Sequence, residues 1–415
     1  MLKSWQEIII GVQLLFVAFG ALVLVPLLTG LDPAIALFTA GIGTLIFHGI
    51  TKNSVPIFLA SSFAFIAPIQ MGIKTFGLGA TLGGLASAGL LYILLGVLVK
   101  LRGVEVIEKY LPAVVTGPVI MVIGLKLAPV AIGMTKNFGE GNQIDPLAIL
   151  VAMVSLAVTV LVVLSKRKFL SLIPILIGIF AGYLLSVILG KVDFTLIKNA
   201  PWFAIPWKEA SKHGAFEMVR FHLPAILYIL PVAIAPAIEH VGDIIAIGSV
   251  AGKDYLEKPG LHRTLMGDGV ATTVASLLGG PPNTTYSEVT GAVALLKQYK
   301  PKLMIIASFA AIILAFWAKL GALLKTIPQP VMGGILVLLF GMIASVGIRS
   351  LIHHKVNLDN PRNMVIVAII LVFGIGDMVL GIGNFQLAGI GLAGIVGVIL
   401  NIILPNTKPN QEETE

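Results

Sequence analysis

The sequence has no cysteine and unusually few charged residues. The absence of cysteine from its 415 residues excludes disulfide bonds and thiolate-bound metals. Charged side chains make up 12% of the chain, whereas about a quarter of the residues of a soluble protein are charged. Apolar residues make up 57% and form runs long enough to cross about 30 Å of hydrocarbon. We therefore predict an all-α protein that crosses a membrane many times.

About fourteen membrane spans are predicted. The first apolar run is too long for a signal peptide and is not followed by a small-residue cleavage site, so it is interpreted as the first span. The 45 glycines and 23 prolines are typical of transporters, whose helices pack closely and break. The predicted spans are 8–29, 33–50, 55–72, 78–100, 110–134, 146–165, 169–189, 221–248, 262–279, 283–297, 303–323, 327–347, 363–381 and 385–404.

The net charge of +8 comes from basic residues scattered through the loops, which form no continuous patch, so no nucleic-acid partner is predicted. Loops on the side of the N-terminus carry about twice as many Lys and Arg as the opposite loops. This asymmetry predicts a multi-pass protein of the cell (inner) membrane, in contact with lipid. With an even number of spans, both termini are expected in the cytoplasm.

The chain contains a candidate internal repeat. Pro112 and Gly117 in the fifth predicted span lie 216 residues before Pro328 and Gly333 in the twelfth. A chance match of small and apolar residues is the alternative. A real repeat would contain seven spans, and this odd number would invert the second copy, as in many alternating-access transporters. The predicted division is a first repeat at 1–190, an external loop at 191–220, a second repeat at 221–404 and a cytoplasmic tail at 405–415.

The third and tenth spans, which correspond in this scheme, do not resemble ordinary helices. Residues 55–68 begin with Val-Pro and end with Ala-Pro, and residues 279–291 begin with Gly-Gly-Pro-Pro-Asn-Thr-Thr. Proline interrupts the helical hydrogen-bond ladder. Interrupted spans at matching positions are the best sequence indication of a transporter's binding site, because their helix N-termini offer unpaired backbone N–H groups.

Four carboxylates within spans are candidate functional groups, since a buried charge in a membrane is costly. Glu239 and Asp243 are four residues apart and would share one helix face. Two acids this close repel when both are ionised, which favours a proton-binding site. Glu288 lies in the interrupted tenth span, and Asp268 lies in the ninth. Alternatively, Glu239 pairs with a basic residue, Glu288 caps a helix, or Asp268 makes a structural contact.

Other polar residues in spans are given structural interpretations. His240 has no second metal ligand at helical spacing and is expected to pack or to form a hydrogen bond. Lys126 is expected to extend toward the membrane surface or to lie at a helix end, and Asp377 is expected to reach the interface. Gln13 either bonds to a neighbouring helix or faces the site. No metal site and no cofactor are predicted other than a coupling proton.

The chain contains five distinctive motifs, Gln13–Pro26, Ser61–Phe65, Glu239–Gly242, Pro259–Arg263 and Pro282–Glu288. In combination they resemble the motifs of the uracil/xanthine permeases, the nucleobase–ascorbate transporter family, over roughly residues 8–404. The resemblance implies fourteen spans in two inverted seven-span repeats, core and gate domains, and short strands in spans 3 and 10. It also implies a small-molecule nucleobase as substrate, symport with H⁺, and a homodimer.

By position, the resemblance assigns nucleobase binding to the carboxylates of Glu239 and Glu288 and to the backbone amides of Phe63 and Ser287. Proton coupling is expected at Glu239, Asp243 and Asp268. Three departures from the family pattern bear on the identity of the nucleobase: Asp243 in place of the His frequent in uracil members, Val289 in place of Asn, and Leu14 in place of His. Glu288 favours uracil, because purine members often have Gln there.

The leading hypothesis is a proton-coupled uracil importer that works by alternating access. A symporter of xanthine, hypoxanthine or urate is the alternative within the family. An inorganic anion transporter is a second class of function, although carboxylates beside both interrupted helices would repel an anion. An enzyme is not predicted, because no nucleophile–base pair is recognisable in the sequence. A scaffold role would leave the buried carboxylates unexplained.

Overall fold

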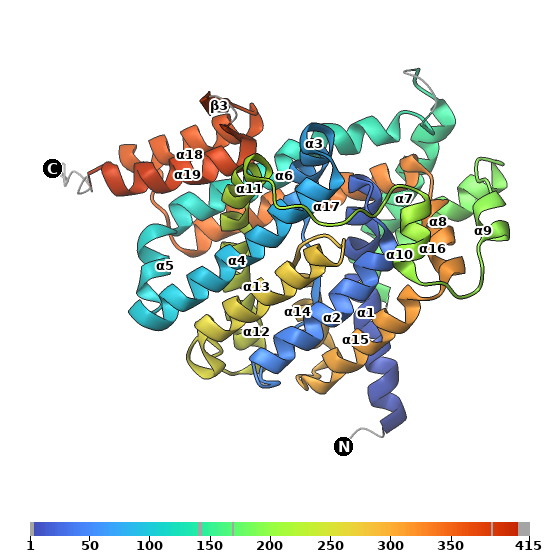
Figure 1. Cartoon of the computed structure of the whole chain (residues 1–415), viewed down its shortest axis with the longest axis horizontal. Coiled ribbons are helices and arrows are strands. Elements are labelled where there is room, and N and C mark those ends of the chain that lie inside the picture. Colours follow the sequence, from blue (N-terminus) through green and yellow to red (C-terminus); the bar gives the residue numbers. More distant parts are fainter. Residues whose placement is uncertain (1–3, 140–142, 168–169, 383–384, 406–415) are drawn as a thin grey trace.

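The protein is a bundle of helices (Figure 1), described by a computed structural model over residues 4–139, 143–167, 170–382 and 385–405. The first half contains α1 Ser4–Thr29, α2 Pro33–Ile50, α3 Ile66–Phe76, α4 Leu78–Arg102, α5 Glu105–Tyr110, α6 Ala113–Thr135, α7 Pro146–Val163, α8 Pro174–Ile188, α9 Thr195–Asn199 and α10 Pro206–Lys212. The second half contains α11 Leu223–Ile229, α12 Ile234–Ala251, α13 Leu261–Leu277, α14 Ser287–Leu296, α15 Lys302–Ala315, α16 Ala318–Lys325, α17 Gln329–His353, α18 Pro361–Ile375 and α19 Gly389–Ile403.

Two short antiparallel strand pairs interrupt the helices. Strand β1 (Leu59–Ser61) pairs with β2 (Asn283–Thr285), and the register places Leu59 opposite Thr285 and Ser61 opposite Asn283. Strand β3 (Val379–Ile382) pairs with β4 (Phe385–Ala388). The first pair joins segments from the two halves of the chain, whereas the second pair is local.

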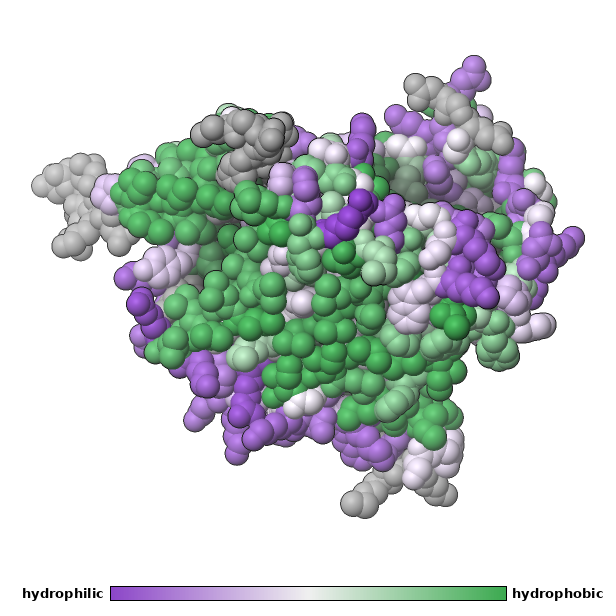
Figure 2. Space-filling view, viewed as in Figure 1, coloured by the Kyte–Doolittle hydropathy of each residue, from purple (hydrophilic) through white to green (hydrophobic). Residues whose placement is uncertain are grey.

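The predicted membrane character is confirmed. Seven helices of the described chain are long and apolar enough to cross a membrane, and five shorter apolar helices accompany them. Large apolar side chains are exposed on the outer helices, for example Phe180 at 66% and Val372 at 68%. Figure 2 shows a broad hydrophobic band with hydrophilic residues gathered along the lower left edge and at the upper right. Such a surface is expected where lipid replaces water.

Most helix contacts fall into two sets. In the first, α4 packs along α13, and α15 packs along α2 and α1. In the second, α6 packs along α17, with α7 and α8 on one side and α18 and α19 on the other. Glycines allow the closest approaches: a Cβ at Gly269 would lie 2.6 Å from the carbonyl oxygen of Gly89, and one at Gly347 would overlap that of Gly117. Backbone contact through small residues is how helices associate in membranes.

Short strands in the third and tenth spans were expected, and β1 and β2 confirm them. Three other predicted spans were too long. The predicted span 303–323 ends at Ala315, because the backbone of the 202–204 loop forms hydrogen bonds with Phe316 and Ala318 and turns the chain into α16. The predicted spans 363–381 and 385–404 are each shorter at their facing ends, where β3 and β4 form a hairpin. Helix α18 ends before Asp377, whose φ of 54° is incompatible with a continuing helix.

Candidate functional site

The centre of the candidate site is the place where β1 and β2 pair side by side, which we call the strand crossing. Pro56 precedes β1, and Pro281 and Pro282 precede β2, so neither segment can continue as a helix. The N–H of Ser62 donates to the carbonyl oxygen of Pro282 at 2.9 Å and extends the pairing beyond the ladder. The backbone groups on the facing edges of the two strands are thereby satisfied inside the protein, as the membrane interior requires.

A helix starts directly after each strand. A 3₁₀ turn (Phe63–Phe65) continues into α3, and α14 begins at Ser287. No side chain caps either start, since Ser62 and Tyr286 make no capping hydrogen bond there. The first N–H groups of a helix have no partner within the helix, so both starts can offer donors to a ligand. Phe63 and Ser287, the residues predicted to contribute backbone amides, occupy the first position of each.

The predicted carboxylates Glu239 and Glu288 lie at this crossing. Glu239, on α12, is half-buried and close enough to Glu288, Asp243 and Asp268 to be repelled by each of them. Glu288, in the first turn of α14, is exposed, although its neighbour Val289 is fully buried. The carboxylate of Glu288 therefore remains accessible beside buried chain at the start of α14. Glu288 is thus placed to accept hydrogen bonds from a small ligand.

Asp243 lies one helical turn beyond Glu239 and contacts β2. Its side chain is 4% exposed, and the hydroxyl of Thr285 donates to its Oδ2 at 2.8 Å. A carboxylate accepts hydrogen bonds whether ionised or protonated, so this contact persists in either state. Asp243 therefore links α12 to the strand that leads into α14 and Glu288.

Asp268 forms a buried contact that sequence reasoning missed. Nδ1 of His240, on α12, lies 3.0 Å from Oδ2 of Asp268, on α13, and both side chains are fully buried. The two groups are close enough for charge attraction, but their orientation does not meet the geometry of a hydrogen bond. His240 was expected to pack or to form a hydrogen bond, and it packs against an acidic side chain of a neighbouring helix, which the spacing within its own helix does not indicate. The hydroxyl of Tyr92, on α4, is buried nearby and lies within electrostatic range of Asp268 and Glu239.

Polar side chains of neighbouring helices hold the strand crossing in place. Thr44 Oγ1, on α2, accepts from the N–H of Leu59 at 2.9 Å. On the other strand, Thr272 Oγ1 donates to the carbonyl oxygen of Asn283 at 2.7 Å. The side-chain Nδ2 of Asn283 in turn donates to the carbonyl oxygen of Thr39 at 3.1 Å. Thr44, Thr272 and Thr39 were not predicted. The only sequence signal for them is a hydroxyl residue in an otherwise apolar span.

The predicted site residues thus meet at one place. Glu239, Asp243 and Glu288 lie within electrostatic range of one another, and Asp268 is also in range of Glu239. Glu288 directly follows the helix start at Ser287, and the ring of Phe63, at the other helix start, lies 6.5 Å from the ring of Tyr286. Among the described residues, no group of three metal-ligating side chains is present. Lys126 does not extend alone toward the surface but contacts Asp377, with Nζ 2.5 Å from Oδ1.

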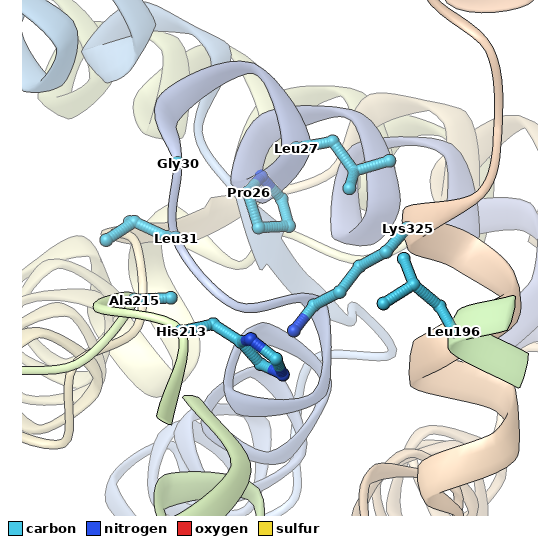
Figure 3. A pocket seen from close by; sticks show the side chains of 8 residues that line it. All are labelled: Pro26, Leu27, Gly30, Leu31, Leu196, His213, Ala215 and Lys325. Atoms are coloured by element: carbon cyan, nitrogen blue, oxygen red, sulfur yellow. The ribbon is translucent and has the colours of Figure 1, made fainter. Parts of the chain in front are cut away.

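A cavity of about 220 Å³ lies away from this site. Figure 3 shows Lys325 extending into it, opposite His213 and beside Pro26 and Leu27. The ammonium of Lys325 contacts Oδ2 of Asp32 at 2.6 Å. Asp32 also caps α2 by accepting from the N–H of Ala34 at 2.8 Å. The charge of Lys325 is therefore neutralised, and this cavity has none of the converging acceptors found at the strand crossing.

Comparison with known proteins identifies the family of the chain. The sequence model of a family described as the permease family matches residues 5–382. A probable uracil permease of Haemophilus influenzae is 52% identical over 407 residues, which cover 98% of this chain and 96% of that protein. The uracil permease of Bacillus caldolyticus is 46% identical over 96% of this chain and 92% of its own length. That of Escherichia coli K12 is 40% identical, over 96% and 91%.

Solved structures of other transporters share the fold. The transmembrane domain of BicA, a cyanobacterial bicarbonate transporter, has a TM-score of 0.62 at 17% identity, covering 95% of this chain and 96% of that one. The murine anion transporter Slc26a9, in an inward-facing state, has a TM-score of 0.69 at 12% identity, covering 97% and 68%. At such low identity the likeness concerns the fold alone.

Proposed function

The chain belongs to the permease family, and from this premise we propose that it imports uracil across the cell membrane together with a proton. Membership of this family makes it a transport protein and not an enzyme. The observation that carries the choice of substrate is the meeting of two carboxylates, Glu239 and Glu288, with two uncapped helix starts. The relatives named uracil permeases support the same choice.

The proposed binding mode follows from hydrogen-bond complementarity. Uracil presents ring N–H donors and carbonyl acceptors along its edge. Glu239 and Glu288 supply acceptors for the N–H groups, and the backbone amides of Phe63 and Ser287 supply donors for the carbonyl oxygens. Hydrogen bonds to an ionised carboxylate are stronger than those between neutral groups. This arrangement rejects molecules that lack the alternation of donor and acceptor.

We assign proton coupling to the acidic cluster of Glu239, Asp243 and Asp268. Glu239 experiences repulsion from three other carboxylates, so a proton shared among them relieves unfavourable charge. Glu239 then takes part in both substrate binding and proton binding. Asp243, held by Thr285, is proposed as the relay that replaces the His expected from the family pattern.

Alternating access by two inverted repeats is proposed for the movement. In the proposed repeat, α2 corresponds to α13 and α4 corresponds to α15. The contact between α4 and α13 therefore has a counterpart in the contact between α15 and α2, and both contacts are extensive. The same correspondence relates α7–α8 to α18–α19. Helices α6 and α17 both begin directly after the corresponding prolines, Pro112 and Pro328. These observations support fourteen spans in two seven-span repeats, with the first contact set as core domain and the second as gate domain.

Both termini are proposed to lie in the cytoplasm, as the distribution of basic loop residues favours. The boundaries at residues 190, 220 and 404, and a homodimer, remain predictions from the repeat and the family resemblance. A symporter of xanthine, hypoxanthine or urate is the alternative within the family, because Asp243, Val289 and Leu14 depart from the uracil pattern.

An anion carrier is the alternative suggested by the fold, since BicA is a bicarbonate transporter and Slc26a9 an anion transporter. The carboxylates at the helix starts argue against it, because they would repel an anion. Thermal shifts of the purified protein with uracil, thymine, xanthine, hypoxanthine and urate would test the choice of nucleobase. Competition between radiolabelled uracil and excess sulfate or bicarbonate would test the anion alternative. Stabilisation by uracil without competition by either anion is expected.

A further inference from the structure

A second cavity, of about 130 Å³, lies where the two contact sets face each other. One wall comes from α3 and α11 and includes Gln70, Met71 and Tyr228. The opposite wall comes from α6 and the ends of α18 and α19, and includes Lys126 and Asp377. Tyr228 precedes Glu239 by eleven residues in the same predicted span, which corresponds to roughly 16 Å at 1.5 Å per residue. The residues that line the cavity include none of the carboxylates at the strand crossing, although Val232, on the same wall as Tyr228, precedes Glu239 by only seven residues.

The backbone around Lys126 and Asp377 is shaped to accommodate their contact. Asp377 has a φ of 54° and Gly389 a φ of 51°. A Cβ at Gly389 would overlap Nζ of Lys126 and would lie 2.6 Å from Oδ1 of Asp377. Three separate segments thus converge on one ion pair. A pair that only joined α6 to the turn after α18 would explain this convergence, but not the cavity on which both charged groups border.

The two charged atoms match one edge of a nucleobase. The Nζ–Oδ1 separation is 2.5 Å. C=O and C–N bonds of about 1.23 and 1.33 Å place the oxygen and nitrogen of an amide group roughly 2.3 Å apart. The ammonium of Lys126 can therefore donate to a ring carbonyl while the carboxylate of Asp377 accepts from the adjacent N–H. The ring of Tyr228, in the facing wall, supplies an aromatic surface for a planar molecule.

We propose that this cavity is an outer subsite, in which Lys126, Asp377 and Tyr228 hold a nucleobase before it reaches Glu239 and Glu288. The proposal rests on the proposed uracil transport and on the proposed orientation, which places the end of α3 and the turn after α18 outside. Its volume is below the 300–1,000 Å³ or so of pockets for drug-sized ligands, so it accommodates only a small solute. A subsite of this kind concentrates substrate at the entrance.

Because the chain has no native cysteine, a thiol reagent can label only a cysteine that is introduced by substitution. Met71 borders the cavity and is 45% exposed, so a Met71→Cys variant of the full-length protein can be labelled by a membrane-impermeant maleimide added outside intact cells. Met218, which is 81% exposed in the predicted external loop, provides the control variant Met218→Cys. We expect uracil to slow labelling of the Met71→Cys variant severalfold and to leave the Met218→Cys variant unaffected.

Two further substitutions, each combined with Met71→Cys, distinguish binding at the subsite from binding at the central site. Protection should persist with Glu288→Gln, in which the central site is impaired, and should be lost with Asp377→Gly, which removes the acceptor but tolerates the positive φ. Lys126→Met is a second test that retains the apolar stem. Labelling of Met218→Cys in these backgrounds checks that each variant is inserted, and the midpoint of thermal denaturation of the purified variant checks that it is folded.

Three outcomes would overturn the subsite: uracil uptake without protection of the Met71→Cys variant, loss of protection with Glu288→Gln alone, or protection unchanged by Asp377→Gly and by Lys126→Met. Absence of both uracil uptake and uracil-induced thermal stabilisation in the parent protein would instead reject the proposed function, and the subsite with it. Failure of Met218→Cys to label from outside, with labelling only after permeabilisation, would reject the outer placement.

Discussion

The two interrupted spans share a backbone arrangement but differ in chemistry. Each consists of a three-residue strand followed by a helix without a side-chain cap. In residues 59–76 this helix start carries Phe63 and Ala64, which contribute only backbone donors. In residues 283–296 the corresponding position to Ala64 is Glu288, and Asp243 is attached to the strand through Thr285.

The difference indicates how a repeated architecture forms an asymmetric site. The geometry of strand and helix start is present twice, whereas the carboxylates belong to the second half alone. A nucleobase with both donors and acceptors needs both kinds of partner. The first half is therefore expected to tolerate side-chain changes that the second half does not, and the following predictions test this contrast.

The largest effect is expected from Glu288→Gln. The change preserves size but removes the charged acceptor, so uracil affinity should fall by about 1.5–3 kcal/mol or more, roughly 10–150-fold. Isothermal titration or a thermal-shift titration of the purified variant would measure it. Ala64→Ser, at the corresponding position in the first half, is the matched control and should bind within about twofold of the parent, because its backbone donors remain. Normal uptake by a folded Glu288→Gln variant would remove Glu288 from the site.

Glu239→Gln should separate binding from coupling. The variant cannot take up the proton proposed to accompany uracil, so exchange of labelled for unlabelled uracil should continue while accumulation against a gradient is lost. In the parent protein, accumulation should rise with an inward proton gradient and collapse with an uncoupler. Accumulation that depends on sodium and is insensitive to the uncoupler would assign coupling to a different ion.

Gly43→Ala tests the support of the strand in the second half. A Cβ at Gly43, on α2, would overlap Nδ2 of Asn283 and displace β2. Overpacking of this kind costs about 1–3 kcal/mol, and a lower midpoint of thermal denaturation is expected. Gly49→Ala in the same helix is the control, since nothing lies within 4 Å of its added Cβ. Equal midpoints for the two variants would mean that β2 adjusts without loss.

The smallest effect on binding is expected from Asp243→Asn. Its amide oxygen can still accept from Thr285, so β2 stays in place and uracil affinity is largely unchanged. The pH dependence of transport should shift or flatten, because Asn cannot relay a proton. Asp243→His should centre the profile nearer the reference His value of about 6.5. An unchanged profile for Asp243→Asn would make Asp243 structural and leave the proton to Glu239 or Asp268.

Much of the fold was predictable from local signals. The predicted span 33–50 coincides with α2, because Asp32 caps it and Pro33 occupies its first turn. Prolines likewise identified the two interrupted spans. The end of α15 was not predictable, because the backbone partners of Phe316 and Ala318 come from a loop more than a hundred residues earlier. The β3–β4 hairpin is as apolar as a span, and hydropathy alone did not distinguish the two.

The site was predictable where its residues follow a motif or share a helix. Glu239 and Asp243 are one turn apart, and Glu288 follows an obvious helix break. The contact between His240 and Asp268 was not predictable, because it depends on how α12 packs against α13 and no spacing within either helix indicates it. The same holds for Thr44 and Thr272, whose role appears only once the strands lie beside them.

The pairing of β1 with β2 also affects how the protein is made. Leu59 cannot pair with Thr285 until that residue, 226 positions later in the sequence, has been synthesised. At about 5–20 residues per second, this delay is on the order of 10–45 s. During that time the backbone groups of β1 lack their partners, and unpaired groups in hydrocarbon cost several kcal/mol each. We therefore expect the nascent first half to remain next to water or to the insertion machinery until the second half arrives, and a ribosome stalled before residue 283 to leave a protease-sensitive chain.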